Sequence, residues 1–120
     1  MVVSACTISN GMKDYSVYLK NILDKAREAI GFCRETSKED FLKDEKTQSA
    51  VILKLIVIGE EATKLSEEIK SAIDLPWRSI IGFRNMAIHE YFDIDLSQIW
   101  ITVQTDLPDL IRKINAYLAE

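Results

Sequence analysis

The sequence predicts an all-α protein, an up-and-down bundle of four long helices and a short one. Apolar residues recur at spacings of three and four along most of the chain, which is the pattern of amphipathic helices. No stretch shows the strict alternation of a β-strand, and only two prolines and four glycines interrupt the 120 residues. Residues 12–120 are expected to form one helical domain, and residues 1–11, which lack periodicity, an N-terminal extension.

Composition narrows the possible locations and ligands. Unbroken apolar runs, such as residues 55–58, are too short to cross a bilayer, and the N-terminus does not resemble a signal peptide, so a cytoplasmic location is expected. Cys6 and Cys33 match neither a disulfide framework nor a metal site, and no metal or cofactor is expected. Because binding to phosphates requires positive charge, the net charge of −4 restricts any nucleic-acid role to a local cluster or to a cleft built from more than one chain.

The first long helix is expected from about Met12 to Cys33. Its apolar stripe consists of Tyr15, Leu19, Ile22, Ala26, Ala29 and Cys33. After it, Ser37 is followed three positions later by Asp40, a capping pattern that predicts a short helical turn. Asp44 is then expected to cap the second long helix.

The second helix, expected over residues 45–73, is apolar on two sides. The first stripe suits the core of the monomer and consists of Val51, Leu55, Ile58, Ala62, Leu65 and Ile69. The roughly opposite side carries a second patch formed by Leu53, Ile56 and Val57, with Glu60 among them. This patch needs another cover, either a further helix of the bundle or a second subunit. Gly59 costs about 1 kcal/mol relative to alanine in mid-helix and would allow another backbone to approach closely.

The third helix is expected from residue 75 to residue 90 or 91, with Pro76 in its first turn and Asp74 as a possible cap. Residues 92–95 interrupt the pattern.

The last helix is expected to begin after Asp95, which has Gln98 three residues later as a capping signal. Its stripe consists of Leu96, Ile99, Trp100, Val103, Leu107, Leu110, Ile111, Ile114 and Leu118. Pro108 falls inside this stripe, so we expect a kink and not two separate helices.

Residues 84–91, RNMAIHEY, combine an arginine, the only histidine and a tyrosine in a pattern that packing alone does not require. Arg84 falls in the middle of an apolar stripe, where a buried guanidinium needs an acceptor. The other members of that stripe are Trp77, Ile80, Ile81, Ala87, Ile88 and Tyr91. Glu60 is the natural partner, and the simplest interpretation is a structural ion pair. Asn85 and His89, four residues apart, are neighbours on the helix surface.

These groups are sufficient for metal-independent phosphodiester cleavage. His89 can act as a general base or acid, and Arg84, long enough to reach the space beside the imidazole, can stabilise charge on phosphoryl oxygens. A lone histidine is more often structural, and one imidazole cannot act as base and acid at once, whereas two copies across a dimer would supply both. No second histidine or suitably spaced cysteine exists to complete a metal site.

From residue 15 to about residue 118 the chain resembles the HepT-like toxins of the HEPN superfamily. The resemblance rests on DEKTQSAVILKLIVIGEEATKLS (residues 44–66), LPWRSIIGFRNMAIHEYF (residues 75–92), DLSQIW and the later DLP. Residues 84–91 match the family's R-x4-H-x-Y motif without departure. The resemblance implies a HEPN-like helical bundle that forms a homodimer and brings two motif copies into one cleft. The family has no counterpart of residues 1–11, to which we assign no function.

The resemblance also implies a metal-independent endoribonuclease toxin of a type VII-like toxin–antitoxin module, acting on RNA and not on DNA. It implies cleavage through attack of the 2′-hydroxyl on the adjacent phosphate, with Arg84 and His89 as the catalytic pair and Asn85 as the polar residue beside them. The implied partner is a minimal nucleotidyltransferase antitoxin that transfers AMP to the motif tyrosine, here Tyr91.

Two readings remain open beside this one. The acidic composition favours a non-catalytic, dimeric helical partner of a nucleotidyltransferase. The second reading concerns Tyr91, which is interpreted as an interfacial aromatic residue with a solvated hydroxyl and not as a catalytic group.

Overall fold

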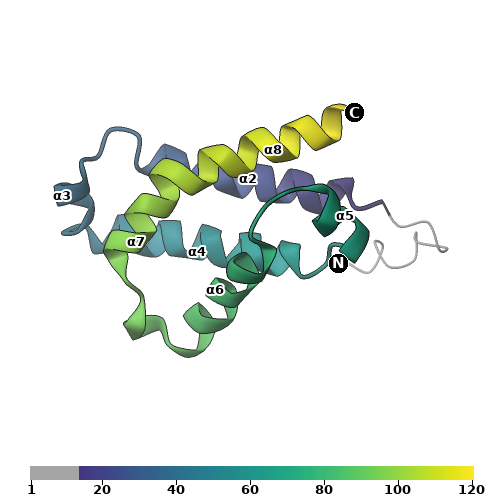
Figure 1. The fold of residues 1–120 in the computed structure, drawn as a ribbon. Coiled ribbons are helices and arrows are strands. Elements are labelled where there is room, and N and C mark those ends of the chain that lie inside the picture. The colour runs from purple at the N-terminus through teal and green to yellow at the C-terminus, as the bar shows by residue number, and fades with distance from the viewer. Residues whose placement is uncertain (1–13) are drawn as a thin grey trace.

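The computed structural model describes residues 14–120, and all the regular structure in that range is helical (Figure 1). The predicted all-α fold is therefore confirmed. The predicted extension, residues 1–11, and the predicted start of the first helix at Met12 lie outside the described residues. None of the described helices is long and apolar enough to cross a membrane.

Two long helices, α2 (Ser16–Phe32) and α4 (Glu45–Ala62), pack side by side at the centre of the bundle, and the short α3 (Lys38–Phe41) lies between them in the chain (Figure 1). The predicted caps are confirmed, because Ser37 Oγ accepts from the Asp40 amide at 3.1 Å and Asp44 Oδ1 from the Thr47 amide at 3.1 Å. The hydrogen bond from the Thr47 hydroxyl also holds the pKa of Asp44 below its usual value.

A buried polar link holds α2 against α4. Glu61 is 6% exposed, and its carboxylate accepts from Asn21 Nδ2 at 2.7 Å and from Lys64 Nζ at 2.8 Å. The hydrogen bond to Glu61 raises the pKa of Lys64. Buried carboxylates are stable only when paired in this way, so the link fixes the register of the two helices within an otherwise apolar interface.

The second helix is shorter than predicted. It ends at Ala62, and a separate helix, α5 (Glu67–Ala72), follows after a turn. Ser66 Oγ accepts from the Ile69 amide at 3.2 Å and caps α5, while the Thr63 hydroxyl donates to the carbonyl of Glu60 at 2.6 Å at the end of α4. Leu65 and Ile69 are both buried, so the apolar stripe continues past the end of α4. The sequence pattern therefore does not reveal the break between α4 and α5.

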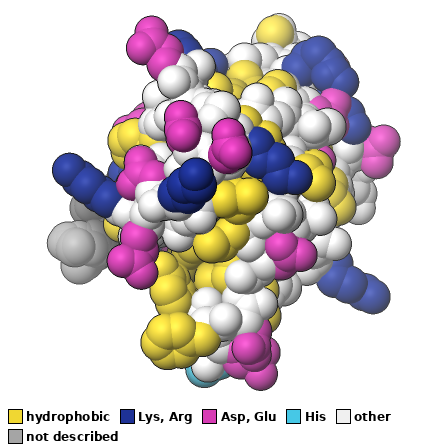
Figure 2. Space-filling model, turned by 90° about the vertical axis from the view of Figure 1, so that its left-hand side faces the viewer, with side chains coloured by type: hydrophobic (Ala, Val, Ile, Leu, Met, Phe, Trp, Pro, Cys, Tyr) yellow, Lys and Arg dark blue, Asp and Glu magenta, His cyan; other side chains and the backbone are white. Residues whose placement is uncertain are grey.

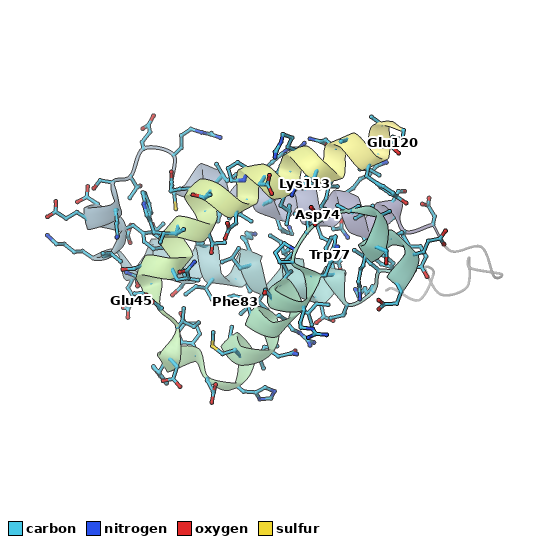
Figure 3. All side chains as sticks on the ribbon, in the orientation of Figure 1. Glu45, Asp74, Trp77, Phe83, Lys113 and Glu120 are labelled. Atoms are coloured by element: carbon cyan, nitrogen blue, oxygen red, sulfur yellow. The ribbon has the colours of Figure 1, made fainter. Side chains whose placement is uncertain are left out.

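Helix α6 (Trp77–His89) packs on α4, and the 3-10 turn η1 (Tyr91–Asp93) ends the predicted third helix where expected. The prediction that Asp74 caps α6 is wrong: the N-cap position is Pro76, and no side chain bonds there. Instead, the carbonyl of Asp74 accepts from Lys113 Nζ at 2.9 Å, and the two side chains lie together in Figure 3.

The last helical stretch runs from α7 (Leu96–Ile101) through a π-helical segment, η2 (Thr102–Asp106), into α8 (Leu107–Ala119). Asp95 Oδ1 accepts from the amide of Ser97 at 3.0 Å and from that of Gln98 at 3.3 Å, which confirms the predicted cap. Pro108 lies inside one continuous helical stretch, as predicted. The irregular part of this stretch is the π-helical segment just before Pro108. Proline has no amide hydrogen for the i−4 carbonyl, and the wider turn relieves the clash of its ring with the preceding turn.

Candidate active site

Gly59 sets the crossing of α4 and α6. A Cβ atom at this position would lie 2.4 Å from Cβ of Arg84 and 3.0 Å from the carbonyl oxygen of Ile80. Only glycine therefore permits this approach, and the close backbone contact predicted for Gly59 is confirmed, with α6 as the approaching segment. The same crossing places the base of the Arg84 side chain directly against α4.

Arg84 is held by two acceptors. Its Nη2 atom lies 2.5 Å from Glu60 Oε1, and its Nη1 atom donates to Asn85 Oδ1 at 2.7 Å. The predicted ion pair with Glu60 is therefore confirmed. The Arg84 side chain is 28% exposed, and its buried Nε atom has no acceptor among the described residues. A guanidinium carries five N–H donors, so further donors remain for an anion.

His89 is the last residue of α6, and its side chain is exposed. Within residues 14–120, no hydrogen bond or ion pair joins it to Arg84 or to another side chain. The structure thus brings Arg84, Asn85 and Glu60 together and leaves His89 one turn beyond Asn85 on the same helix. An imidazole in this position is open to a substrate and can exchange protons with it.

Tyr91 begins η1, just beyond the end of α6. Its hydroxyl lies 3.3 Å from Ser49 Oγ on α4, and its ring contacts that of Phe92 edge to face at 6.0 Å between centroids. The Tyr91 side chain is exposed, so a partner can reach its hydroxyl. Sequence reasoning missed Ser49, because a contact across 42 positions depends on how α4 and α6 cross and leaves no local signal.

A group of exposed apolar residues lies within four sequence positions of Ser49 or Tyr91. These residues are Leu53, Ile88, Tyr91 and Phe92, and we call them the exposed apolar face. Leu53 lies one turn after Ser49 on α4 and Ile88 three residues before Tyr91, so the four side chains flank the end of the motif. Ile56, from the second patch predicted on α4, packs against the core, whereas Leu53 is 55% exposed. Helix α6 therefore covers only part of that patch.

A groove of about 460 Å³ separates α6 from α7 and α8. Phe83, labelled in Figure 3, is one of its mostly apolar lining residues. Its charged lining residues are Asp93, Asp95, Asp106 and Asp109, and no Lys, Arg or His among residues 14–120 lines it. We call it the acidic groove, and its charge is unfavourable for a polyanion.

Charges elsewhere are mixed. On the face drawn in Figure 2, Lys and Arg side chains are interspersed with Asp and Glu and with hydrophobic side chains. Among the described residues, no three or more His, Cys, Asp and Glu side chains are grouped so that they could hold a metal ion. Any nucleic-acid binding would therefore depend on a small number of local groups or on a cleft built from more than one chain, as the net charge of −4 indicates.

Comparison with known proteins adds independent support. A family model described as "Ribonuclease HepT-like" matches residues 22–117. A "Putative RNase" of Methanocaldococcus jannaschii is 36% identical over 109 residues, which cover 90% of each chain. A "Probable ribonuclease HepT" of Thermococcus cleftensis is 37% identical over 102 residues, 84% of this chain and 93% of that protein. No solved structure matches the chain significantly. The match over most of the chain confirms the resemblance inferred from the motif segments: the protein belongs to the HepT-like ribonuclease family.

Proposed function

We propose that the protein is a metal-independent endoribonuclease toxin whose active site forms between two copies of the chain. The observation that carries the proposal is the placement of Arg84, Asn85 and His89 along one helix, in a chain that belongs to a ribonuclease family. Arg84 supplies a positive charge, and His89 supplies an imidazole that can accept or donate a proton. Both are accessible to a substrate.

Cleavage follows from these groups without a metal. His89 of one subunit removes the proton of the ribose 2′-hydroxyl, and the 2′-oxygen then forms a bond to the adjacent phosphorus. The bond from phosphorus to the 5′-oxygen breaks, and that oxygen takes a proton from the imidazolium of His89 of the partner subunit. The products are a 2′,3′-cyclic phosphate and a free 5′-hydroxyl. Arg84 stabilises the negative charge that develops on the phosphoryl oxygens.

The test of this proposal is RNA cleavage by purified wild-type protein in the presence of EDTA, together with growth of cells that express it without a partner. Cleavage with EDTA present and growth arrest are the expected results. A wild-type protein that neither cleaves RNA nor slows growth would favour the second candidate, a non-catalytic dimeric partner of a nucleotidyltransferase. The acidic net charge and the exposed apolar face support that candidate.

We propose that Leu53, Ile88 and Phe92 of the exposed apolar face form the dimer interface, with Tyr91 at its edge, where its hydroxyl stays accessible. Leu53 is 55% exposed and Phe92 is 98% exposed, and large apolar side chains exposed in this way often mark sites of association. Leu53→Glu is expected to give a monomer and to lower RNA cleavage by at least about a hundredfold, because each cleavage requires two imidazoles. Light scattering and cleavage rates measure the two effects.

Val17→Glu is the matched control for this prediction, since Val17 on α2 is also 55% exposed and lies away from the motif in the chain. It is expected to remain dimeric and active. A Leu53→Glu protein that stays dimeric would show that the interface lies elsewhere.

A nucleotidyltransferase partner is proposed to inactivate the protein by transferring AMP to Tyr91. The Tyr91 oxygen attacks the α-phosphorus of ATP, its proton is released, and pyrophosphate leaves. The bulky anion then occupies the space beside Arg84 that an RNA phosphate needs. After co-expression with a minimal nucleotidyltransferase of the proposed class, intact mass should show one added AMP on wild type and none on Tyr91→Phe. A Tyr91→Phe protein that still gains this mass would contradict the assignment.

A further inference from the structure

A second hollow, of about 710 Å³, lies between α5 and α6. Its polar lining residues are Glu67, Lys70 and Ser71 on α5 and Arg78 and Asn85 on α6. Asn85 also accepts a hydrogen bond from Arg84, so this hollow directly adjoins the candidate active site. It differs in charge from the acidic groove, which lies on another side of α6 and has four aspartates and no cation in its lining.

Gly82 lines this hollow and has no side chain to fill it. It lies in the middle of α6, where glycine destabilises a helix by about 1 kcal/mol relative to alanine. Gly59 is explained by the close approach of Arg84, but a Cβ atom at Gly82 would meet nothing within 4 Å. Packing among the described residues therefore does not require glycine at this position. Its effect is to expose the α6 backbone to whatever occupies the hollow.

The hollow and the reactive histidine lie on one strip of α6. Arg78, Gly82, Asn85 and His89 are separated by four, three and four residues. At about 100° per residue these positions fall within about 60° of one another around the helix, and they span about 16 Å along it. A strand laid along this strip would pass from Arg78 over Gly82 to Asn85 and His89.

The cations of the hollow suit phosphates. Arg78 is exposed and forms no ion pair with any described residue. Lys70 is only 17% exposed, and its Nζ atom lies 3.5 Å from a carboxylate oxygen of Glu67, whose own side chain is 91% exposed. Because the Glu67 carboxylate of this pair is almost fully solvated, the pair is weak and Glu67 can be replaced by another anion.

We propose that this hollow holds the ribose–phosphate backbone of the RNA on one side of the scissile phosphate. Arg78 and Lys70 bind phosphates of the strand, and Gly82 lets the strand lie against the helix backbone. The inference rests on the proposed ribonuclease function, and it adds a substrate-positioning surface to the chemistry of Arg84 and His89.

The test compares Arg78→Ala, Lys70→Ala and Gly82→Leu with two matched controls. Arg27→Ala removes an exposed arginine from α2, and Gly31→Leu fills a second glycine whose Cβ position is open. Cleavage of a single-stranded oligoribonucleotide gives kcat and KM. Fluorescence anisotropy gives the affinity for the same oligonucleotide at several salt concentrations, with each change made in a His89→Ala background that binds without cleaving.

Arg78→Ala and Lys70→Ala are each expected to raise KM about three- to tenfold with kcat nearly unchanged. Each should also reduce the slope of log affinity against log salt by about 0.7, the contribution of one phosphate contact on a single strand. Gly82→Leu is expected to raise KM at least as much without a change in the salt slope, because it blocks the path and removes no charge. Both controls should behave as wild type, and melting temperatures should show that all variants fold.

Wild-type cleavage with KM and salt slopes of the three variants equal to those of the controls would overturn the inference and leave the ribonuclease proposal intact. Dissociation of the dimer by Arg78→Ala or Gly82→Leu would also overturn it, because the hollow would then be an interface between proteins. Arg78-dependent binding without cleavage by wild type would support the hollow and contradict the catalytic proposal. A wild-type protein that neither binds nor cleaves the oligonucleotide would contradict both the inference and the ribonuclease proposal.

Discussion

Replacing His89 by alanine is expected to lower the rate of RNA cleavage by about a thousandfold or more. Positioned acid–base groups each contribute about 10²–10⁴-fold, and in the proposed site the homodimer loses both of its imidazoles at once. The loss should occur in kcat, since the side chain is proposed to act on protons and not to bind the strand. The His89 side chain is exposed, so the melting temperature should not change.

Mixed dimers make this prediction sharper. When wild-type and His89→Ala subunits exchange freely, only a dimer with two histidines contains both base and acid. Cleavage should then fall as the square of the wild-type fraction. A linear fall would mean that one imidazole is sufficient, and a His89→Ala protein as active as wild type would exclude His89 from the chemistry altogether.

Gly59→Ala is expected to destabilise the fold by about 1–3 kcal/mol, the usual range for overpacking. The added methyl group would lie 2.4 Å from Cβ of Arg84, an atom that cannot rotate away, and 3.0 Å from a backbone oxygen. The two helices must therefore separate, although alanine is intrinsically the better helix former. Because Arg84 stands at this contact, cleavage should decrease together with stability. Denaturant unfolding at constant protein concentration measures the stability change.

Gly31→Ala is a control for which no loss of stability is expected. A Cβ atom at Gly31 meets nothing within 4 Å, so alanine should leave stability unchanged or raise it by up to about 1 kcal/mol. If Gly59→Ala also stabilises the protein, the helices can move apart without loss, and the crossing is less tightly packed than the structure shows.

The sequence predicted what depends on local patterns and on residues out of place in them. Ser37, Asp44 and Asp95 cap helices because each precedes an amphipathic stretch, and all three are found where expected. Arg84 and Glu60 could be paired in advance because each is a charge among apolar residues of its helix, although their side chains are 28% and 45% exposed.

Features that depend on how helices cross could not be predicted. The end of α4 at Ala62 was hidden because buried residues continue at helical spacing through the turn that follows. The contact of Tyr91 with Ser49 and the hollow between α5 and α6 each require the three-dimensional placement of distant segments. The dimer stays a prediction, because the second subunit must be inferred from the exposed apolar face.

The π segment at Thr102–Asp106 controls the rotation of the C-terminal helix. Each residue of an α-helix turns the chain by about 100°, so an insertion or deletion here would rotate everything beyond it by that amount. Leu110 and Ile114, now buried, would leave the core, and Asp109, which lines the acidic groove, would turn with them. Chain length in these five residues is therefore as strictly constrained as residue identity in the core.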